Sequence, residues 1–183
     1  EKKLSKSVEV EPLLVGYPAK GYELSQFFLT PSSVEIEGLE STVKDLKAIE
    51  TEPIDLSGRT EDFTVRLRLK KPDQFSSFPG GDTVEFFGIV QEKTILKTIE
   101  KVDLIALDLS SEFVVSGVPR DAWLKVQGSQ LLLKKLNTQE FMLTFDCSDI
   151  EVPVSPDVPR GVLVLKYSPT QVQVEVSRLE ELE

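Results

Sequence analysis

Apolar and polar residues alternate along most of the chain, at the period of two that is typical of β-strands. The clearest case is residues 63–70, where every second residue is apolar and the others are threonine, arginine or lysine. One face of this strand is expected to lie in a core and the other in water. The same alternation predicts strands at 8–15, 22–29, 34–38, 54–56 and 84–86, and at 102–106, 113–115, 124–126, 141–145, 162–164 and 172–176.

Helical spacing occurs in two short segments, 41–49 and 129–136, each of which begins with a serine suited to cap a helix. Helices this short are marginal in isolation, so both are expected to pack against a sheet. The expected caps are Ser41 and Ser129; the expected apolar faces are Val43, Leu46 and Ile49 in the first helix and Leu132, Leu133 and Leu136 in the second.

Two segments fall outside these patterns. Residues 1–7 are mostly charged or polar, and we expect them to form a frayed lead-in. Residues 72–82 are rich in proline, serine and glycine, which predicts a loop between two strands.

An internal repeat organises the chain. Residues 31–58 are predicted to form a strand, a glycine turn, a short helix and a second strand that closes on Asp-Leu-Ser-Gly, and a weaker copy runs from Pro119 to Ser148. The apolar positions and the glycine recur after 90 residues and the Asp-x-Ser motif after 91, so one residue is inserted between them. Such a mixed pattern kept in register predicts a tandem repeat. The matched pairs are Val34 and Leu124, Ile36 and Val126, Gly38 and Gly128, Val43 and Leu133, Leu46 and Leu136, Asp55 and Asp146, and Ser57 and Ser148.

The length agrees with the repeat, because 183 residues suit two domains of about 90. We place the first domain at 1–91 and the second at 92–183, with no flexible spacer between them. Hydrophobic residues make up 40% of the chain, which is enough for a packed core. The expected class is mainly β: two small domains of antiparallel strands, each with one short helix.

The net charge and the residues at the two chain ends restrict which partners and which location we expect for the protein. The net charge of −10 argues against nucleic acid as a partner, because binding to phosphates is driven by cationic residues. The acids are spread along the chain, as in a solvated acidic surface. No segment approaches the roughly 18 apolar residues of a spanning helix. The chain begins without methionine and ends in Leu-Glu, a common cloning remnant, so we expect a fragment of a longer protein whose anchor or signal lies outside it.

Residues that carry chemistry are scarce. The absence of histidine removes histidine-dependent nucleophilic sites, imidazole metal ligation and the commonest general base. Cys147 is the single cysteine, which excludes an internal disulfide, and its neighbour Phe145 favours a buried thiol over a reactive one. Gly80 and Gly81 lack the Lys-Ser/Thr of a phosphate-binding loop and predict a turn. No pair of carboxylates is singled out for glycoside hydrolysis. We therefore assign no catalytic, cofactor-binding or metal-binding residue, and we expect no cofactor.

The repeated Asp-x-Ser motif has two interpretations. Asp55 with Ser57, and Asp146 with Ser148, can close Asx and Ser turns at strand ends. Alternatively, their oxygens can ligate a hard cation, and Asp149 and Glu151 lie nearby in the second copy. Recurrence at one topological place favours the structural interpretation.

Two groups of aromatic residues can each be interpreted in two ways. Trp123 and the pair Phe86-Phe87 suit either partner contact or a structural use, as core packing or strand-edge cover, and the structural use is favoured. Tyr17 and Tyr22 flank the Pro-Ala-Lys-Gly turn, where we expect them to pack across it, the alternative being an exposed contact patch.

The motifs of the first unit resemble those of a YbbR-like domain: Gly16-Tyr-Pro-Ala-Lys-Gly-Tyr22, Thr30-Pro-Ser-Ser-Val34, Gly38 and Ile54-Asp-Leu-Ser-Gly58. The second unit is similar through Phe113-Val-Val-Ser-Gly-Val-Pro119, Gly128, Asp146-Cys-Ser148 and Ser168-Pro-Thr-Gln-Val172. It departs from the pattern at Cys147, where the family has leucine, and at Trp123, and it lacks the Pro-Ala-x-Gly-Tyr turn.

This resemblance implies small antiparallel sheets splayed into an irregular, barrel-like or Y-shaped fold. It also implies tandem domains behind a membrane anchor, on the extracytoplasmic side of a bacterial membrane, and in one branch regulation of a membrane diadenylate cyclase. We therefore expect a non-enzymatic spacer and protein-interaction platform, with the cyclase as the implied partner and the oligomeric state left open. The alternative is a carbohydrate or cell-wall binding module, which would require an exposed Trp123 beside a second aromatic residue.

Overall fold

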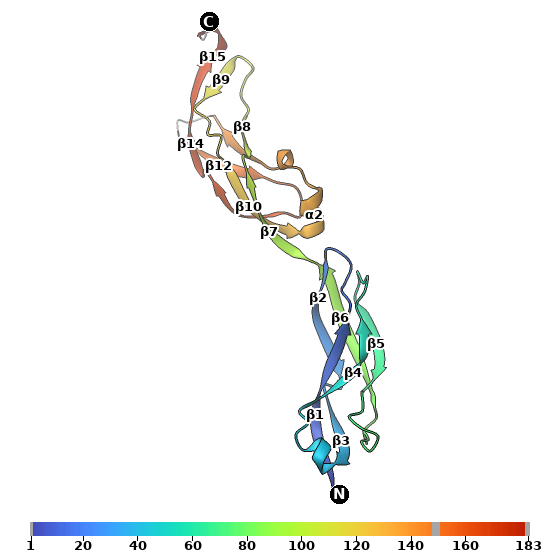
Figure 1. Cartoon of the computed structure of the whole chain (residues 1–183). Helices are drawn as coiled ribbons and strands as arrows, with labels where there is room; N and C mark the ends of the chain where they lie inside the picture. Colours follow the sequence, from blue (N-terminus) through green and yellow to red (C-terminus); the bar gives the residue numbers. More distant parts are fainter. Residues whose placement is uncertain (1, 148–150, 182–183) are drawn as a thin grey trace. The chain divides into compact units, whose positions relative to one another are not determined.

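The computed structural model describes residues 2–147 and 151–181 and forms two compact units, unit 1 (Glu1–Glu92) and unit 2 (Lys93–Glu183). Figure 1 shows that both units are built mainly from strands, with very little helix. Strands account for 59% and helices for 9%, so the predicted mainly-β class is confirmed. No helix in the described part of the chain is long and apolar enough to cross a membrane.

Unit 1 contains two three-stranded sheets. In the first, the central strand β1 is antiparallel to β3 and parallel to β4. In the second, the central strand β6 is antiparallel to both β2 and β5. The bounds are β1 Lys3–Val15, β2 Tyr22–Thr30, β3 Ser33–Leu39, α1 Glu40–Val43, β4 Ala48–Asp55, β5 Phe63–Arg68 and β6 Thr83–Glu92.

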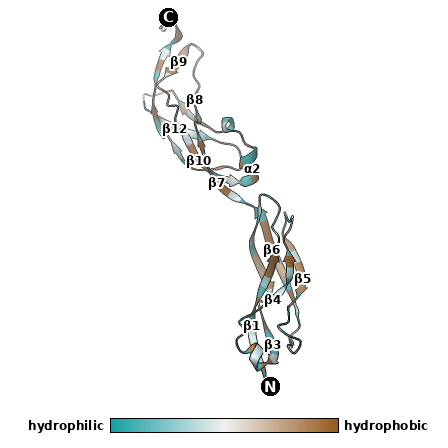
Figure 2. Ribbon diagram, in the orientation of Figure 1, coloured by the Kyte–Doolittle hydropathy of each residue, from teal (hydrophilic) through white to brown (hydrophobic). Residues whose placement is uncertain are grey.

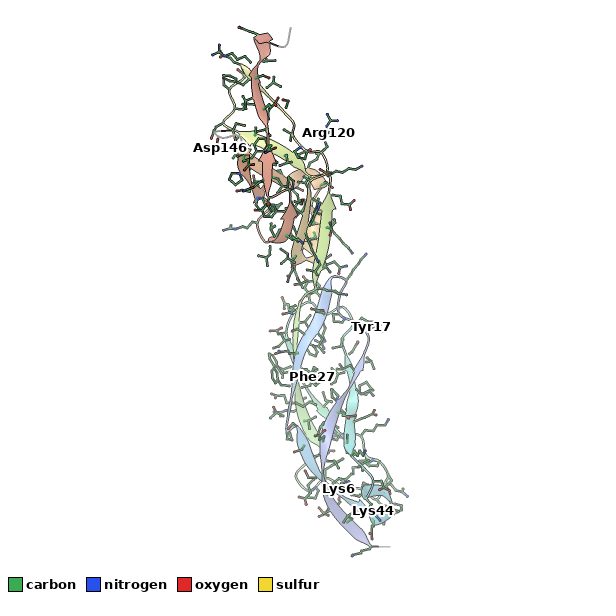
Figure 3. The ribbon with its side chains drawn as sticks, turned by 90° about the vertical axis from the view of Figure 1, so that its left-hand side faces the viewer. Lys6, Tyr17, Phe27, Lys44, Arg120 and Asp146 are labelled. Atoms are coloured by element: carbon green, nitrogen blue, oxygen red, sulfur yellow. The ribbon has the colours of Figure 1, made fainter. Side chains whose placement is uncertain are left out.

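The predicted frayed lead-in is wrong, because β1 already begins at Lys3, which pairs with Leu39 of β3. Within this stretch, the Lys6 ammonium donates hydrogen bonds to the carbonyl oxygens of Lys44 and Leu46, at 2.9 and 2.8 Å. Figure 3 shows Lys6 and Lys44 together at this end of the unit. A cation at the carbonyl end of a helical turn is favourable. These hydrogen bonds and the pairing with β3 hold the lead-in, so its strand structure depends on partners distant in sequence.

The first predicted helix is also partly wrong. It is a single turn, α1, whose cap position is Leu39 rather than Ser41, with no side-chain capping bond. Ile49, predicted on its apolar face, lies in β4 instead. Val43 is fully buried, so one apolar contact with the sheet holds the turn in place.

Gly38 gives this turn its close approach to β3. A Cβ at position 38 would lie 2.9 Å from both the Val43 Cγ2 and the Ser76 Oγ. In unit 2, a Cβ on Gly128 would lie 3.5 Å from the Leu133 Cγ. The repeated glycine therefore stands in both units where the short helix meets the sheet.

Unit 2 has more and shorter strands, arranged in the orders β13-β10-β7, β14-β12-β11-β8 and β15-β9. The predicted cap of its helix is confirmed, since the Ser129 Oγ accepts the Leu132 N–H at 3.3 Å. The bounds are β7 Thr94–Glu100, β8 Asp103–Leu107, β9 Phe113–Ser116, β10 Trp123–Ser129, α2 Gln130–Lys135, η1 Thr138–Glu140, β11 Met142–Asp146, β12 Glu151–Asp157, β13 Leu163–Ser168, β14 Gln171–Gln173, β15 Glu175–Arg178 and η2 Leu179–Glu181.

The tandem repeat is visible in the strand pairing. In unit 1, β1 pairs in parallel with β4, and Val15 is the partner of Asp55. In unit 2, β8 pairs in parallel with β11, and Leu107 is the partner of Asp146. The long strand β1 corresponds to β7 followed by β8, with a break at Lys101, where φ is 53°. Asp55 and Asp146 thus end equivalent strands of equivalent parallel pairs.

Three clusters of buried apolar residues stabilise the units, two within unit 1 and one within unit 2. Figure 2 shows hydrophobic positions concentrated on strands such as β5 and β6. The predicted two-faced strand is confirmed: Phe63 and Leu69 are buried, whereas Arg66 and Arg68 are exposed. The clusters are Val8, Val10, Ile36, Val43, Ile49, Leu69, Phe78 and Val84 in unit 1; Ile54, Leu56, Phe63, Phe86 and Val90, also in unit 1; and Ile99, Val102, Ala122, Leu124, Val126, Leu133, Phe141, Leu143, Phe145, Val152, Val154, Val172 and Val174 in unit 2.

Candidate functional site

The Asp-x-Ser motif of unit 1 forms a turn that joins two strand ends. The Asp55 Oδ1 accepts the backbone N–H of Ser57 at 2.9 Å. On either side, Leu56 donates its N–H to the Val15 carbonyl at 2.8 Å and Gly58 donates to the Tyr17 carbonyl at 3.2 Å. The motif therefore ties the end of β4 to the turn after β1, and the structural interpretation is confirmed in unit 1.

Arg59 completes this corner. Its Nε donates to the Asp55 carbonyl at 2.8 Å, and its guanidinium lies 3.6 Å from the centre of the Phe63 ring. Hydrogen bonds from the Ser57 side chain and backbone, followed by the charge of Arg59, lower the pKa of Asp55 from its ordinary value of 3.8. This carboxylate is engaged in holding the turn.

The cation interpretation gains no support. Within residues 2–147 and 151–181, no group of three or more Asp, Glu, Cys or His side chains is placed to hold a metal ion. In unit 2, Glu151 is exposed and accepts a hydrogen bond from the Gln173 amide at 3.1 Å. Ser148 and Asp149 lie outside the described residues.

The lowered pKa of Asp55 predicts a specific sensitivity to acid. A carboxyl whose pKa is depressed in the folded state contributes stability above its unfolded pKa, and that contribution is lost as the pH falls through the folded value. We expect the melting temperature of the chain to decrease when the pH is lowered below about 4, and to decrease less in Asp55→Asn. Circular dichroism melts between about pH 2 and pH 6 measure this.

The matched control is Glu61→Gln, which removes a charge from an exposed side chain of the same unit. This variant is expected to follow the wild-type acid profile. Equal profiles for Asp55→Asn and Glu61→Gln would contradict the role given to Asp55.

Cys147 lies half-buried against the core of unit 2. Burial, and then the negative charge of Asp146, raise the pKa of its thiol. A reactive cysteine needs the opposite shift, because the thiolate is the nucleophile. The residue is less enclosed than predicted, yet its surroundings fit an inert thiol.

The pair Phe86-Phe87 divides between core and surface. Phe86 is fully buried, with its ring centre 5.5 Å from that of Phe27 and 5.6 Å from that of Phe63. Phe87 lies on the opposite face of β6, is 37% exposed and stacks at 6.3 Å on Phe28 of β2, which is 53% exposed. Phe86 is therefore a core residue, whereas Phe87 is a surface aromatic.

The two tyrosines do not pack across their turn as predicted. Tyr17 is 87% exposed, and Figure 3 shows it on the outside of unit 1, whereas Tyr22 is half-buried at the start of β2. Trp123 is half-buried in the middle strand β10, between Glu100 and Ser168. Among the described residues no aromatic ring stacks on Trp123. The aromatic platform that a carbohydrate module would need is therefore not seen there.

Sequence reasoning missed a groove in each unit. The unit 1 groove has a volume of about 540 Å³ and is lined by Leu14, Leu56 and the β2 residues Leu24, Ser25, Gln26, Phe27 and Phe28. It lies where the end of β1 faces β2. Figure 3 places Phe27 on β2, in the middle of the unit.

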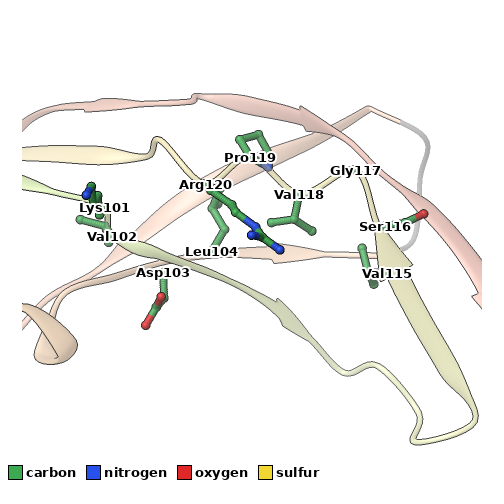
Figure 4. A pocket seen from close by; sticks show the side chains of 10 residues that line it. All are labelled: Lys101, Val102, Asp103, Leu104, Val115, Ser116, Gly117, Val118, Pro119 and Arg120. Carbon is green, nitrogen blue, oxygen red and sulfur yellow. The ribbon is translucent and has the colours of Figure 1, made fainter.

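The unit 2 groove, about 550 Å³ in volume, is bordered by residues 101–104 on one side and 115–120 on the other. Figure 4 shows its apolar side chains Val102, Leu104 and Val118, and a guanidinium of Arg120 that points in a different direction from the Asp103 carboxylate. One signal could have pointed to the unit 1 opening, namely a long predicted strand at 22–29 that carries neither lysine nor proline.

Comparisons with known proteins place this fold in a family. The family model described as YbbR-like protein matches residues 8–78. A solution structure of a Streptococcus thermophilus protein is 30% identical, with 50% of this chain and 87% of that chain covered and a TM-score of 0.40. The YbbR-like domain of a Listeria monocytogenes protein is 23% identical, with coverage of 46% and 95% and a TM-score of 0.37.

A YbbR-like protein from Streptococcus pneumoniae is similar along 98% of both chains, at 14% identity and a TM-score of 0.32. The comparison with curated proteins gives no match. The family match falls entirely within unit 1 and includes its Pro-Ala-Lys-Gly-Tyr turn, its Gly38 and its Asp-Leu-Ser motif. Unit 1 therefore carries a YbbR-like domain, and the family resemblance is confirmed over residues 8–78.

Proposed function

We propose that the chain is a non-catalytic, extracytoplasmic module of a bacterial membrane-anchored protein, and that it serves as a spacer and protein-interaction platform. The observation that carries this proposal is the open groove in each unit, beside a strand edge. The residues with catalytic potential support it as well: the sequence has no histidine, and the Asp55 carboxylate is engaged in a turn. Exposed strand edges are common sites of protein recognition.

The partner in this proposal is a membrane diadenylate cyclase, as the family resemblance implies. A spacer built from two units, each with its own buried cluster, would hold the interaction surface away from the membrane. The membrane anchor of the proposal lies outside the sequence described.

Pull-down from the producing bacterium tests this function. The full-length protein is cross-linked in its own membrane and purified, and the cyclase is expected among the recovered proteins. The control is a version that keeps the native anchor but lacks residues 1–183. Deletion of the whole protein is expected to change the cellular level of the cyclic dinucleotide. Equal recovery of the cyclase without these residues, or an unchanged cyclic dinucleotide level, would contradict the proposal.

A further inference from the structure

Strand β2 has one unpaired edge. It is the outer strand of the order β2-β6-β5, so one side is bonded to β6 and the other has no partner strand in the described chain. Natural edge strands are usually short or carry lysine, proline or a covering element, because their free N–H and C=O groups pair with other chains. β2 is nine residues long, contains no lysine or proline, and has Glu23 as its single charge. This edge is open to strand addition.

The end of β1 faces the same opening. β3 pairs with one edge of β1 from Lys3 to Glu9, and β4 pairs with the other edge from Glu9 to Val15. After Val10, whose N–H donates to the Ser32 carbonyl, the edge used by β3 has no further strand partner in the part of the chain described. Pro12 has no N–H to donate, whereas β2, after a bulge between Leu24 and Gln26, offers uninterrupted backbone partners from Gln26 to Thr30.

Apolar side chains lie between these two strands without a cover. Leu14 is 37% exposed and Phe27 is 42% exposed, and both line the unit 1 groove. Phe28, which is 53% exposed, also lines the groove but stacks on Phe87 at the outer face of β2. Leu56, at the base of the groove, belongs to the buried cluster that also contains Phe86. An apolar side chain placed here would extend an existing core.

The unit 2 groove repeats this opening. It lies between the start of β8 and the end of β9, which is the outer strand of its pair with β15. By the repeat offset, Val115 of β9 corresponds to Leu24 of β2, and both residues line their grooves. Two copies that differ widely in sequence leave the same place unfilled, so the gap is a property of the fold and not of one loop.

The sheet that contributes Leu14 to the unit 1 groove has an acidic solvent face. The solvent face of the sheet β3-β1-β4 carries exposed glutamates on all three strands, and Glu11 and Glu50 are register partners. Within these three strands, which are described in full, the single basic residue on that face is Lys3, at the far end of β1. The glutamates of this acidic face are Glu9, Glu11, Glu35, Glu37, Glu50 and Glu52.

We infer that the unit 1 groove receives an extended segment of a partner protein in which apolar and basic residues alternate. The segment would pair with the free edge of β2 and place its apolar side chains against Leu14, Phe27 and Leu56. Its basic side chains, on the other face, would meet Glu23 and the acidic face. This inference rests on the proposed function, since it names the chemistry of the partner that an interaction platform would take.

The test uses the 183-residue chain and a synthetic peptide, acetyl-Lys-Val-Lys-Val-Lys-Val-Lys-amide. NMR amide spectra are recorded during titration up to about 1 mM peptide. We expect shifts and slowed amide exchange in β2, at Tyr22–Thr30, because a paired strand protects the amides along its edge. The acidic counterpart, in which glutamate replaces lysine, is expected to cause no shift.

Two matched variants locate the site. Phe28→Lys places a like charge and removes an aromatic ring at the groove, and should weaken peptide binding about tenfold or more. Phe75→Lys makes the same change at a 62% exposed loop position outside the groove and should leave binding unchanged. Both side chains are exposed, so both variants are expected to fold, which their amide spectra verify.

Four results would overturn the inference: no shift with the basic peptide, equal binding of the acidic peptide, shifts confined to residues outside β2, or equal loss in the two variants. Sedimentation of the free chain adds a fifth, since a dimer abolished by Phe28→Lys would show that a second copy occupies the groove. The proposed function and this inference can each fail without the other. Recovery of the cyclase without peptide binding would mean that the cyclase uses another surface, whereas peptide binding without cyclase recovery would mean that the partner is different.

Discussion

Replacing Phe86 with alanine is expected to lower the free energy of unfolding of unit 1 by about 4 kcal/mol. The Phe86 side chain is fully buried in the middle of β6, between the rings of Phe27 and Phe63. Its removal loses the transfer free energy of the ring and leaves a cavity that the two sheets can close only in part. A loss of this size is a large part of the stability of a small unit.

The single tryptophan allows the two units to be followed separately. Trp123 lies in unit 2, so its fluorescence reports the unfolding of that unit, whereas far-ultraviolet circular dichroism reports both. Each unit has its own buried cluster. In urea, Phe86→Ala is therefore expected to move a circular dichroism transition to lower concentration and to leave the Trp123 transition in place.

The control is the adjacent residue. Phe87→Ala removes the same ring from the outer face of β6, where the side chain is 37% exposed, and is expected to cost less than about 1.5 kcal/mol. Equal costs for the two variants would contradict the inside-outside alternation of β6. A shift of the Trp123 transition in Phe86→Ala would instead show that the units unfold as one.

The strands could be predicted from the sequence where the pattern that encodes them lies within neighbouring residues. In β5 the alternation of apolar and polar side chains directly encodes its two faces, and the buried Phe63 and exposed Arg66 lie as predicted. The repeat was equally readable, because Gly38 leaves no room for a Cβ where the short helix meets the sheet and Gly128 lies at the equivalent place. Periodicity and close packing leave a trace in the chain itself.

The elements that were mispredicted depend on distant partners. The charged start of β1 becomes a strand because β3 supplies its partners and Lys6 binds the end of α1. The strand β12 was missed because Pro153 and Pro156 interrupt its apolar pattern, yet it pairs with β11 and β14. Ser41 fails as a cap because the chain needs only one helical turn before β4 begins.

The grooves could not be predicted for the same reason. A sequence shows that residues 22–30 form an apolar strand, but not which of its edges is left without a neighbour. That depends on the order in which six strands pair. The Asp-x-Ser motif was a better subject for sequence reasoning, because the turn that it closes lies within three residues.

Replacing Gly16 with alanine is expected to cost about 3 kcal/mol of the stability of unit 1, the second large effect. Gly16 has φ of +73°, which is unfavourable for residues with a Cβ by about 1–2 kcal/mol. A Cβ there would also collide with the Ser57 Oγ and lie 3.1 Å from the Asp55 Oδ1. The variant therefore disturbs the corner that joins β1 to β4.

Gly58→Ala separates the two contributions. Gly58 has φ of +70°, nearly that of Gly16, but a Cβ there would have nothing within 4 Å. This control is expected to cost only about 1–2 kcal/mol, the conformational part, in the same urea titration followed by circular dichroism. The additional loss in Gly16→Ala is assigned to the collision, so Ser57→Gly, which removes the Oγ, should recover part of it when combined with Gly16→Ala. Equal costs for Gly16→Ala and Gly58→Ala, with no recovery in the double variant, would show that strain at φ alone makes Gly16 necessary and that the Asp-Leu-Ser corner tolerates a side chain against it.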